Sequence, residues 1–210
     1  MILRLAAALS LAFGAAALLI YSDVMGHGPV AGEAARHLRA MKDRRAAPDS
    51  VTSVTLDDIA ALPHRAPPAE VGALERRGAA IEGYIQRMLR AGDDDYHLEV
   101  VITPRRSGGP DTTYAAAEIT PAVRGASPRW TYDGLIAAFR PNHGGRTAWD
   151  AGPRRVRVSG WLLYDFQYDV IPSEWQKQMG APRISGWEIH PVTRIELWDD
   201  ALGRYLDYPR

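Results

Sequence analysis

Hydrophobic and polar residues alternate with a period of two from Gly186 to Asp200, the longest such run in the chain. This period is typical of a β-strand with one buried and one solvent-exposed face. We therefore expect this stretch to form the strand around which the domain is built. The apolar set is Trp187, Ile189, Pro191, Thr193, Ile195 and Leu197, and the polar set includes Glu188, His190, Arg194 and Glu196.

Four earlier stretches alternate in the same way, and each is expected to be a strand: residues 81–86, 96–103, 114–120 and 155–164. In the second of these strands, the side chains from Tyr96 to Ile102 at every other position should share one face. A helix is expected after the third strand, with Ser127 as its N-cap and Pro128 in its first turn. The order predicts a mainly β fold, a five-stranded OB-like Greek-key barrel with one capping helix at residues 79–200.

The segments outside the barrel have different patterns. Residues 1–24 hold a basic residue followed by an uncharged apolar run, which indicates either a cleavable export signal or a membrane anchor. Residues 25–78 are expected to form a tether with short helices, one of them capped by Thr55, and residues 201–210 a short tail. The protein is therefore expected in the cell envelope, anchored in the inner membrane or periplasmic or secreted, with residues 1–24 as its membrane contact.

Composition narrows the chemistry further. The chain has 25 Lys and Arg against 25 Asp and Glu, so no overall charge draws it to nucleic acid or to an anionic membrane. It has no cysteine, which excludes disulfides, thiolate nucleophiles and zinc–thiolate sites. No phosphate loop, dinucleotide motif or serine nucleophile elbow is present.

Two groups of polar residues have side chains of the kind that bind metal or transfer protons. Asp95, His97 and Glu99 alternate onto one face of the second strand, and Glu188 and His190 do the same on the last. Carboxylates with imidazoles suit zinc, manganese or general acid–base work. The alternative is a structural or surface role, since an exposed face collects polar residues. In an OB barrel these two strands are not neighbours, so a shared site would need help from loops.

The long connection from Asp165 to Ser185 is expected to be a flap or a binding loop. Asp165, Tyr168, Asp169 and Trp175 could form the lip of a ligand site, or the loop could simply pack over the barrel end through its tryptophan. Trp161 is a further aromatic candidate for ligand binding. With Arg105, Arg106, Arg154, Arg155 and Arg157 it could also line a groove for single-stranded nucleic acid, although zero net charge and the export signal count against that.

Three strings resemble a group of exported bacterial proteins of uncharacterised function with an OB-like barrel: Asp95 to Glu99, Val158 to Asp165, and Trp-Glu-Ile-His-Pro-Val at 187–192. The resemblance implies the fold and export from a bacterial cell, and it brings no established activity. In those relatives a histidine follows the aspartate that matches Asp165. The corresponding positions here are Phe166, Gln167 and Tyr168, which counts against a metal ligand there.

From these observations we expect a non-catalytic binding or assembly module that uses no cofactor and folds without metal. Its partner would be an envelope protein or a small ligand. The alternatives are a metal-dependent hydrolase and a single-strand nucleic-acid binder. We also expect His190 to satisfy backbone groups left unpaired beside Pro191, with a loss of about 1–3 kcal/mol in His190→Ala.

Overall fold

The structure is a computed structural model that describes residues 32–66, 68–103, 113–141, 152–169 and 183–209. The chain divides into two compact units, residues 1–43 and 44–210. The described part of the first unit is helix α2 (Glu33–Lys42). Glu33 lies in its first turn, and Arg39 and Lys42 lie in its last turn. These charges complement the helix dipole. The helix lies in the segment where the sequence predicts short helices.

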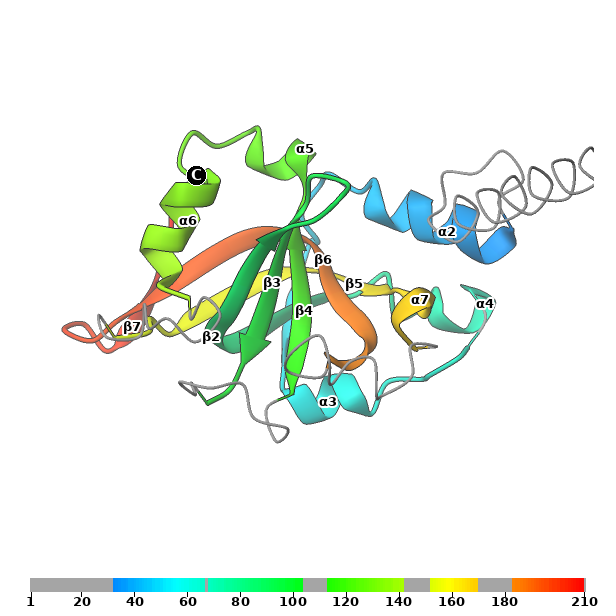
Figure 1. The fold of residues 1–210 in the computed structure, drawn as a ribbon. Coiled ribbons are helices and arrows are strands. Elements are labelled where there is room, and N and C mark those ends of the chain that lie inside the picture. Colours follow the sequence, from blue (N-terminus) through cyan, green and yellow to red (C-terminus); the bar gives the residue numbers. More distant parts are fainter. Residues whose placement is uncertain (1–31, 67, 104–112, 142–151, 170–182, 210) are drawn as a thin grey trace, which may run out of the picture. The chain divides into compact units, whose positions relative to one another are not determined.

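The second unit is mainly β (Figure 1). Its strands are β1 (Val51–Val54), β2 (Gly78–Arg90), β3 (Tyr96–Val101), β4 (Tyr114–Ile119), β5 (Val156–Tyr164), β6 (Arg183–Asp199) and β7 (Arg204–Asp207). Its helices are short: α3 (Leu56–Ala60), α4 (Pro68–Val71), α5 (Pro121–Arg124), α6 (Tyr132–Phe139) and α7 (Phe166–Asp169).

Five of the strands form a ring in the order β2-β3-β4-β6-β5, which the pairing of β5 with β2 closes. The β4–β6 pair is parallel, and the other neighbours in the ring are antiparallel. Two strands are added at the margins. β1 runs parallel to β2, and β7 runs antiparallel to the end of β6. The seven strands form one mixed sheet, where the sequence predicted five strands.

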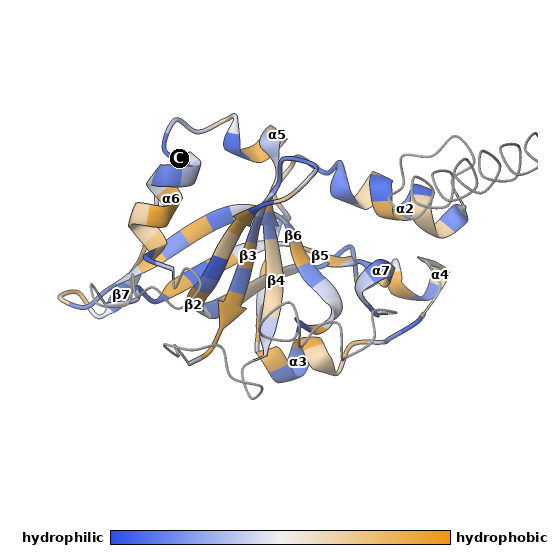
Figure 2. Ribbon diagram, viewed as in Figure 1, coloured by the Kyte–Doolittle hydropathy of each residue, from blue (hydrophilic) through white to orange (hydrophobic). Residues whose placement is uncertain are grey.

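The core lies inside the ring, and its residues come from alternate positions of the strands. Blue and orange residues accordingly alternate along β2 and β6 (Figure 2). Trp187, Ile189, Ile195 and Leu197 of β6 belong to this core, as the sequence predicted. The alternation changes phase at Pro191, because Val192 joins the core in the next step. The predicted irregularity at the proline is therefore confirmed.

The irregularity has a local steric cause. The pairing of β5 with β6 shifts register on both sides of Gly160. A Cβ atom at Gly160 would lie 2.1 Å from the backbone oxygen of Pro191, so only glycine fits opposite the proline. The peptide bond between His190 and Pro191 is cis. The carbonyl of His190 accepts a hydrogen bond from the side chain of Arg44 (3.0 Å).

Two helices close the barrel with side chains that the sequence patterns identify. α3 packs against β6 and β4, and it begins with the predicted capping box, in which Thr55 and Asp58 bond to each other's backbone amide. α6 packs against β2 and places Leu135 and Phe139 in the core. Its predicted start at Ser127 is wrong, because Thr131 is the N-cap and its side chain accepts from the amide of Gly134.

Other segments also differ from expectation. Ile102 lies beyond the end of β3 and is 49% exposed, so it does not share the buried face of that strand. Residues 51–54 of the expected tether and 204–207 of the expected tail are strands, since the edges of β2 and β6 offer them free hydrogen-bonding groups. The helical turn α5, capped by Thr120, was not predicted. Residues 1–24 lie outside the described residues.

Candidate functional site

The polar face of β6 is buried in its first half. Glu188 and His190 are both 0% exposed, so the predicted solvent-exposed face is wrong there, whereas Arg194 farther along the strand is exposed as predicted. The first half is covered because its polar side contacts Asp95, which precedes β3, Glu118 of β4 and Arg183 at its own start. We call the cluster of Asp95, Glu118, Glu188 and His190, with Arg183, the polar cluster. All five of these side chains are buried, each at most 5% exposed.

His190 occupies the centre of the polar cluster. Its Nδ1 lies 3.1 Å from Oε2 of Glu118 and 3.2 Å from Oε1 of Glu188. Its Nε2 lies 3.5 Å from Oδ2 of Asp95 at the start of β3. The ring therefore faces carboxylates on both sides. This corrects the expected role of His190, because the imidazole contacts carboxylates, and Arg44 is the residue that contacts the backbone beside Pro191.

Glu118 and Arg183 are the members of the polar cluster that were not predicted from the sequence. Glu118 lies on β4, which is between β3 and β6 in the ring, so it links the two strands that carry the predicted residues. Its Oε1 lies 2.9 Å from Nδ1 of His97, and its other oxygen faces His190. A signal was present in the sequence: Glu118 is the only charged residue of an otherwise alanine-rich strand. β3 and β6 were expected to need a loop to form a shared site, and Glu118 of β4 joins them instead.

Arg183 provides the positive charge of the polar cluster. Its Nη2 lies 2.6 Å from Oε2 of Glu188, and its Nε donates to the backbone oxygen of Ser185 (2.8 Å). Its guanidinium lies over the ring of Tyr168, 4.0 Å from the ring centre. Both side chains of the pair are at most 2% exposed. Tyr168, predicted as a ligand-binding residue, is therefore in contact with the cation that holds Glu188.

The environment shifts the ionisation of these groups. Burial alone would lower the pKa of His190, but the hydrogen bonds and charges of Glu118 and Glu188 outweigh it and raise this pKa to about 9. Burial alone would raise the pKa of Glu118, but hydrogen bonds from His190 and His97 hold it well below its usual range. In the protein without a bound ion, His190 therefore carries a proton at neutral pH.

The remaining predicted metal residues divide between two places. Asp95 and His190 meet as part of the polar cluster, and with Glu118 they place one potential ligand atom each within 4.8 Å of one another. His97 reaches this group only through Glu118. Glu99 lies outside it and is held by Arg87, whose Nε donates to Oε1 of Glu99 (2.9 Å). The face that carries Glu99 is also buried, as its 2% exposure shows.

The predicted ligand lip is engaged in structural contacts where it is described. Asp169 is 5% exposed and accepts from the hydroxyl of Tyr164 (2.7 Å), and it lies 3.2 Å from Nδ1 of His64. Oδ1 of Asp165 accepts from the amide of Gln167 (3.1 Å). These contacts fasten the start of the connection to the end of β5. Trp175, the fourth predicted member, lies outside the described residues.

Trp161 is also held in place. Its indole Nε1 donates to the backbone oxygen of Ala46 (2.7 Å), and the guanidinium of Arg44 lies 5.1 Å from the centre of its ring. These contacts join the start of the second unit to β5. A ligand that used the indole donor would have to displace Ala46. The role of Trp161 as a ligand-binding residue remains a prediction.

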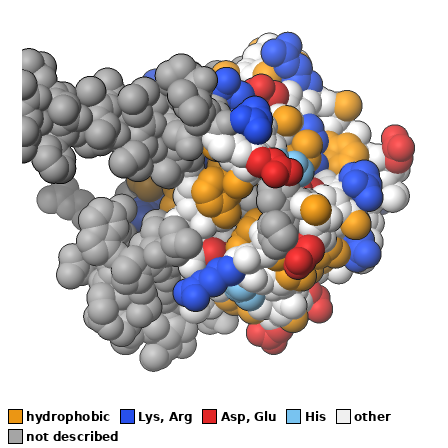
Figure 3. All heavy atoms as spheres, turned by 90° about the vertical axis from the view of Figure 1, so that its right-hand side faces the viewer, with side chains coloured by type: hydrophobic (Ala, Val, Ile, Leu, Met, Phe, Trp, Pro, Cys, Tyr) orange, Lys and Arg blue, Asp and Glu red, His pale blue; other side chains and the backbone are white. Residues whose placement is uncertain are grey.

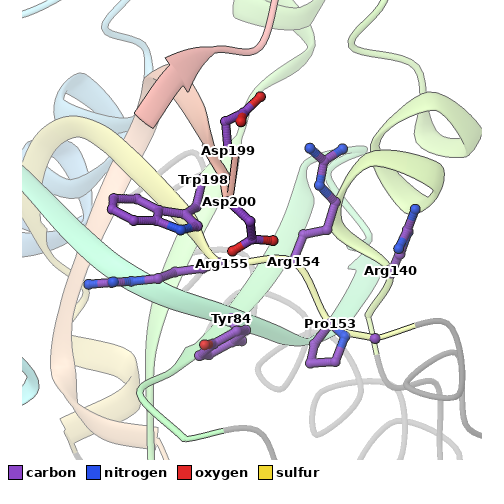
Figure 4. Close-up of a pocket in the computed structure, with 9 residues that line it drawn as sticks. Tyr84, Arg140, Pro153, Arg154, Arg155, Trp198, Asp199 and Asp200 are labelled. Atoms are coloured by element: carbon purple, nitrogen blue, oxygen red, sulfur yellow. The ribbon is translucent and has the colours of Figure 1, made fainter. Parts of the chain in front are cut away.

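A separate open cleft lies near the ends of β5 and β6. Its volume is about 610 Å³, which is within the usual range for a small-molecule site. Figure 4 shows its walls, with Trp198 and Arg155 on one side and Arg140, Arg154 and Pro153 on the other. The lining residues are Tyr84, Arg140, Gly152, Pro153, Arg154, Arg155, Trp198, Asp199 and Asp200.

Some of the arginines in and near this cleft are already held in ion pairs. Arg155 lies 5.2 Å from the ring centre of Trp198, and its Nη2 lies 2.7 Å from Oε2 of Glu82. Arg157, on the same strand, also contacts Glu82. Ion pairs therefore occupy two of the arginines that could have formed a nucleic-acid groove. Figure 3 shows a different face of the molecule, the right-hand side of Figure 1, and on it basic and acidic side chains are interspersed rather than separated.

The comparisons with known proteins add no identity. No model of a known protein family matches the chain, and no curated protein matches it. Among the described residues, no helix has the length and apolar character needed to cross a membrane.

Proposed function

We propose that this protein is a non-catalytic binding module of the bacterial cell envelope, built on an OB-like barrel. The ring order, with a parallel β4–β6 pair and helices α5 and α6 between β4 and β5, supports the OB-like assignment. The apolar run in residues 1–24 supports export. The module would bind an envelope protein or a small ligand and would need no cofactor for binding.

The observation that carries the proposal is the cleft between Tyr84 and Trp198. It combines two aromatic side chains with arginines and with two carboxylates from the end of β6, and this mixture suits a ligand with both a flat apolar part and charged groups. We propose that Arg154 provides the charge that selects an anionic group of the ligand. Asp165 and Asp169, which were predicted as ligand residues, would then serve to hold the start of the connection in place.

The second candidate function is a metal-dependent hydrolase. It is favoured by the convergence of Asp95, Glu118 and His190. It is opposed by their burial, since each is at most 5% exposed and a substrate has no described path to them. A metal in a hydrolase keeps one coordination position open to water or substrate. Incubation of the purified protein with zinc or manganese and nitrophenyl ester and phosphoester substrates should give no turnover above that of His190→Ala.

The binding proposal can be tested in cells of the source organism. A photo-crosslinking amino acid at Tyr84 should give a discrete crosslinked species, found by mass spectrometry, whereas the same amino acid at Leu89 should not. Leu89 is a suitable control because it is an exposed residue of the same strand, 39% accessible, and does not line the cleft. Arg154→Glu should abolish the crosslink. Equal labelling from both positions, or none from Tyr84, refutes this assignment of the cleft.

The envelope location has its own test. Mass spectrometry of the native N-terminus together with membrane fractionation distinguishes the two forms of export. An intact start in the membrane fraction supports an anchor, and a start near residues 22–30 supports cleavage. A cytosolic protein with an unprocessed N-terminus contradicts export and would favour the alternative of a single-strand nucleic-acid binder.

A further inference from the structure

Three strands of the ring bring one potential metal ligand each to the same point. Asp95 precedes β3, Glu118 belongs to β4 and His190 to β6, and one ligand atom of each lies within 4.8 Å of the other two. Two are 5% exposed and the third is 0% exposed. The cluster therefore is not a chance gathering of acidic groups on a surface. It is built into the ring, next to its core.

The orientation of His190 is that of a metal ligand. Its Nδ1 faces the carboxylates of Glu118 and Glu188, whereas its Nε2 is buried and has no hydrogen-bond partner among the described residues. Nε2 faces Oδ2 of Asp95 at 3.5 Å, which is longer than an ordinary hydrogen bond. With bonds of about 2.0–2.1 Å, neighbouring ligand atoms in a tetrahedral zinc site are about 3.3 Å apart. The observed spacing fits two atoms that share an ion.

The residues behind these ligands hold them in position. Glu188 approaches Nδ1 of His190 at 3.2 Å, an arrangement that fixes the imidazole tautomer and leaves Nε2 for a metal. Arg183 in turn holds the second oxygen of Glu188 at 2.6 Å. His97 holds one oxygen of Glu118 at 2.9 Å. Metal sites use such supporting hydrogen bonds, and here two of the three proposed ligands have them.

The charge balance of the polar cluster also favours a bound cation. The named side chains of the polar cluster are three buried carboxylates, one arginine and one histidine, so with a neutral imidazole they carry two more negative than positive charges. Buried charge is costly unless it is paired. One divalent cation would supply two positive charges at the point where Asp95 and Glu118 converge with His190. A proton on His190 would supply one of them, so the metal-bound and the protonated cluster are the two states that an experiment has to separate.

We propose that Asp95 and Nε2 of His190 bind one divalent cation, with Zn²⁺ as the ion that fits best. Glu118, whose ligand atom lies within 4.8 Å of both, completes the site when its carboxylate turns from Nδ1 of His190 toward the ion. The nitrogen and carboxylate oxygen donors suit zinc, and manganese is the nearest competitor. The ion would link β3, β4 and β6 across the ring. This departs from the expectation of no cofactor drawn from the sequence, because Glu118 supplies the ligand that the predicted set lacked. The metal site shares no residue with the cleft, so the metal-binding and ligand-binding proposals can be refuted independently.

The test uses the full chain after treatment with a chelator and dialysis. Isothermal titration with Zn²⁺ alone and with Mn²⁺ alone should show one ion per chain, with zinc bound more tightly. Saturating zinc should raise the unfolding midpoint by about 5 °C or more, because the ion binds the folded state only. Substitution with Co²⁺ should give the visible absorption of a four-coordinate site. Absence of stoichiometric binding of both metals by the parent protein refutes the site.

Matched variants locate the ion. Asp95→Asn should weaken zinc binding by about 100-fold or more and remove the cobalt absorption. Glu99→Gln is the control, because Glu99 is a similarly buried carboxylate of β3, the strand that Asp95 precedes, and it is held by Arg87. This variant should bind zinc like the parent. If Asp95→Asn does not fold, Glu118→Gln replaces it. Equal zinc affinity in the parent, the Asp95 or Glu118 variant and the control overturns the assignment.

Discussion

Arg44 connects three parts of the second unit that are far apart in sequence. Its guanidinium donates to the backbone oxygens of Glu75 (2.6 Å), Leu162 (2.9 Å) and His190 (3.0 Å). Burial lowers the pKa of Arg44 to about 10, which still leaves it charged at neutral pH. The carbonyls of Leu162 and His190 lie where the β5–β6 ladder shifts register. We therefore predict that Arg44→Leu destabilises the domain through its backbone.

The size of the effect follows from these contacts. A hydrogen bond to a charged group contributes about 1.5–3 kcal/mol. Three such bonds are lost, but Arg44 is only partly buried, so water can reach some of the carbonyls and the removal of a buried cation returns part of the loss. We expect a net loss of about 2–4 kcal/mol. At about 2–4 °C per kcal/mol for a domain of this size, the unfolding midpoint should fall by about 4–16 °C.

The assay is equilibrium unfolding in urea, followed by tryptophan fluorescence and circular dichroism. Arg45→Leu is the matched control, since Arg45 is the exposed neighbour in sequence and should change stability by no more than about 0.5 kcal/mol. Arg44→Lys should lie between the two, because an ammonium group cannot reach three carbonyls as a guanidinium does. The reasoning is refuted if Arg44→Leu and Arg45→Leu unfold at the same urea concentration.

Two further substitutions, each with a control, test the buried ion pair and the close contact between β5 and β6. Arg183→Met leaves Glu188 buried without its closest cation and should cost about 3–5 kcal/mol in urea unfolding. Arg194→Met, which removes an exposed ion pair of the same strand, should cost less than about 1 kcal/mol, and similar losses in both would contradict the assigned burial. Gly160→Ala places a methyl group against a backbone oxygen of β6 and should lower stability by about 1–3 kcal/mol. Gly92→Ala should have little effect, because no atom lies within 4 Å of the new methyl group. Equal unfolding midpoints of the two glycine variants would show that β5 and β6 can move apart to accept the methyl group at residue 160 without loss of stability.

The local parts of the fold were predictable from the sequence. The period of two identified the core-facing residues of β6, since successive side chains of any strand point to opposite sides. The capping box at Thr55 was predictable because it joins residues only three apart. The irregularity at Pro191 was predictable because proline cannot donate a hydrogen bond to the ladder. The start of α6 was not, because Ser127 and Thr131 both have side chains that cap helices and the pattern could not choose between them.

The candidate sites depended on contacts between distant residues. The sequence placed Asp95 and His190 on suitable faces, but their meeting depends on which strands are neighbours in the closed ring, and Glu118 enters only because β4 lies between them. Likewise, alternation predicts two faces of β6 without showing that both are covered, so the polar face was expected in water.

The cleft and the contacts of Arg44 likewise could not be predicted from local sequence patterns. The sequence by itself determined the alternating strands, the apolar core, the capped helix α3 and an N-terminal apolar run, because short-range sterics and hydrophobic periodicity govern all of these. Only the tertiary structure decided that Arg44 reaches three carbonyls, that Glu118 joins His190, and that a cleft lies between Tyr84 and Trp198. Each of these depends on closing the ring, which brings residues into contact across long stretches of chain that no local pattern describes.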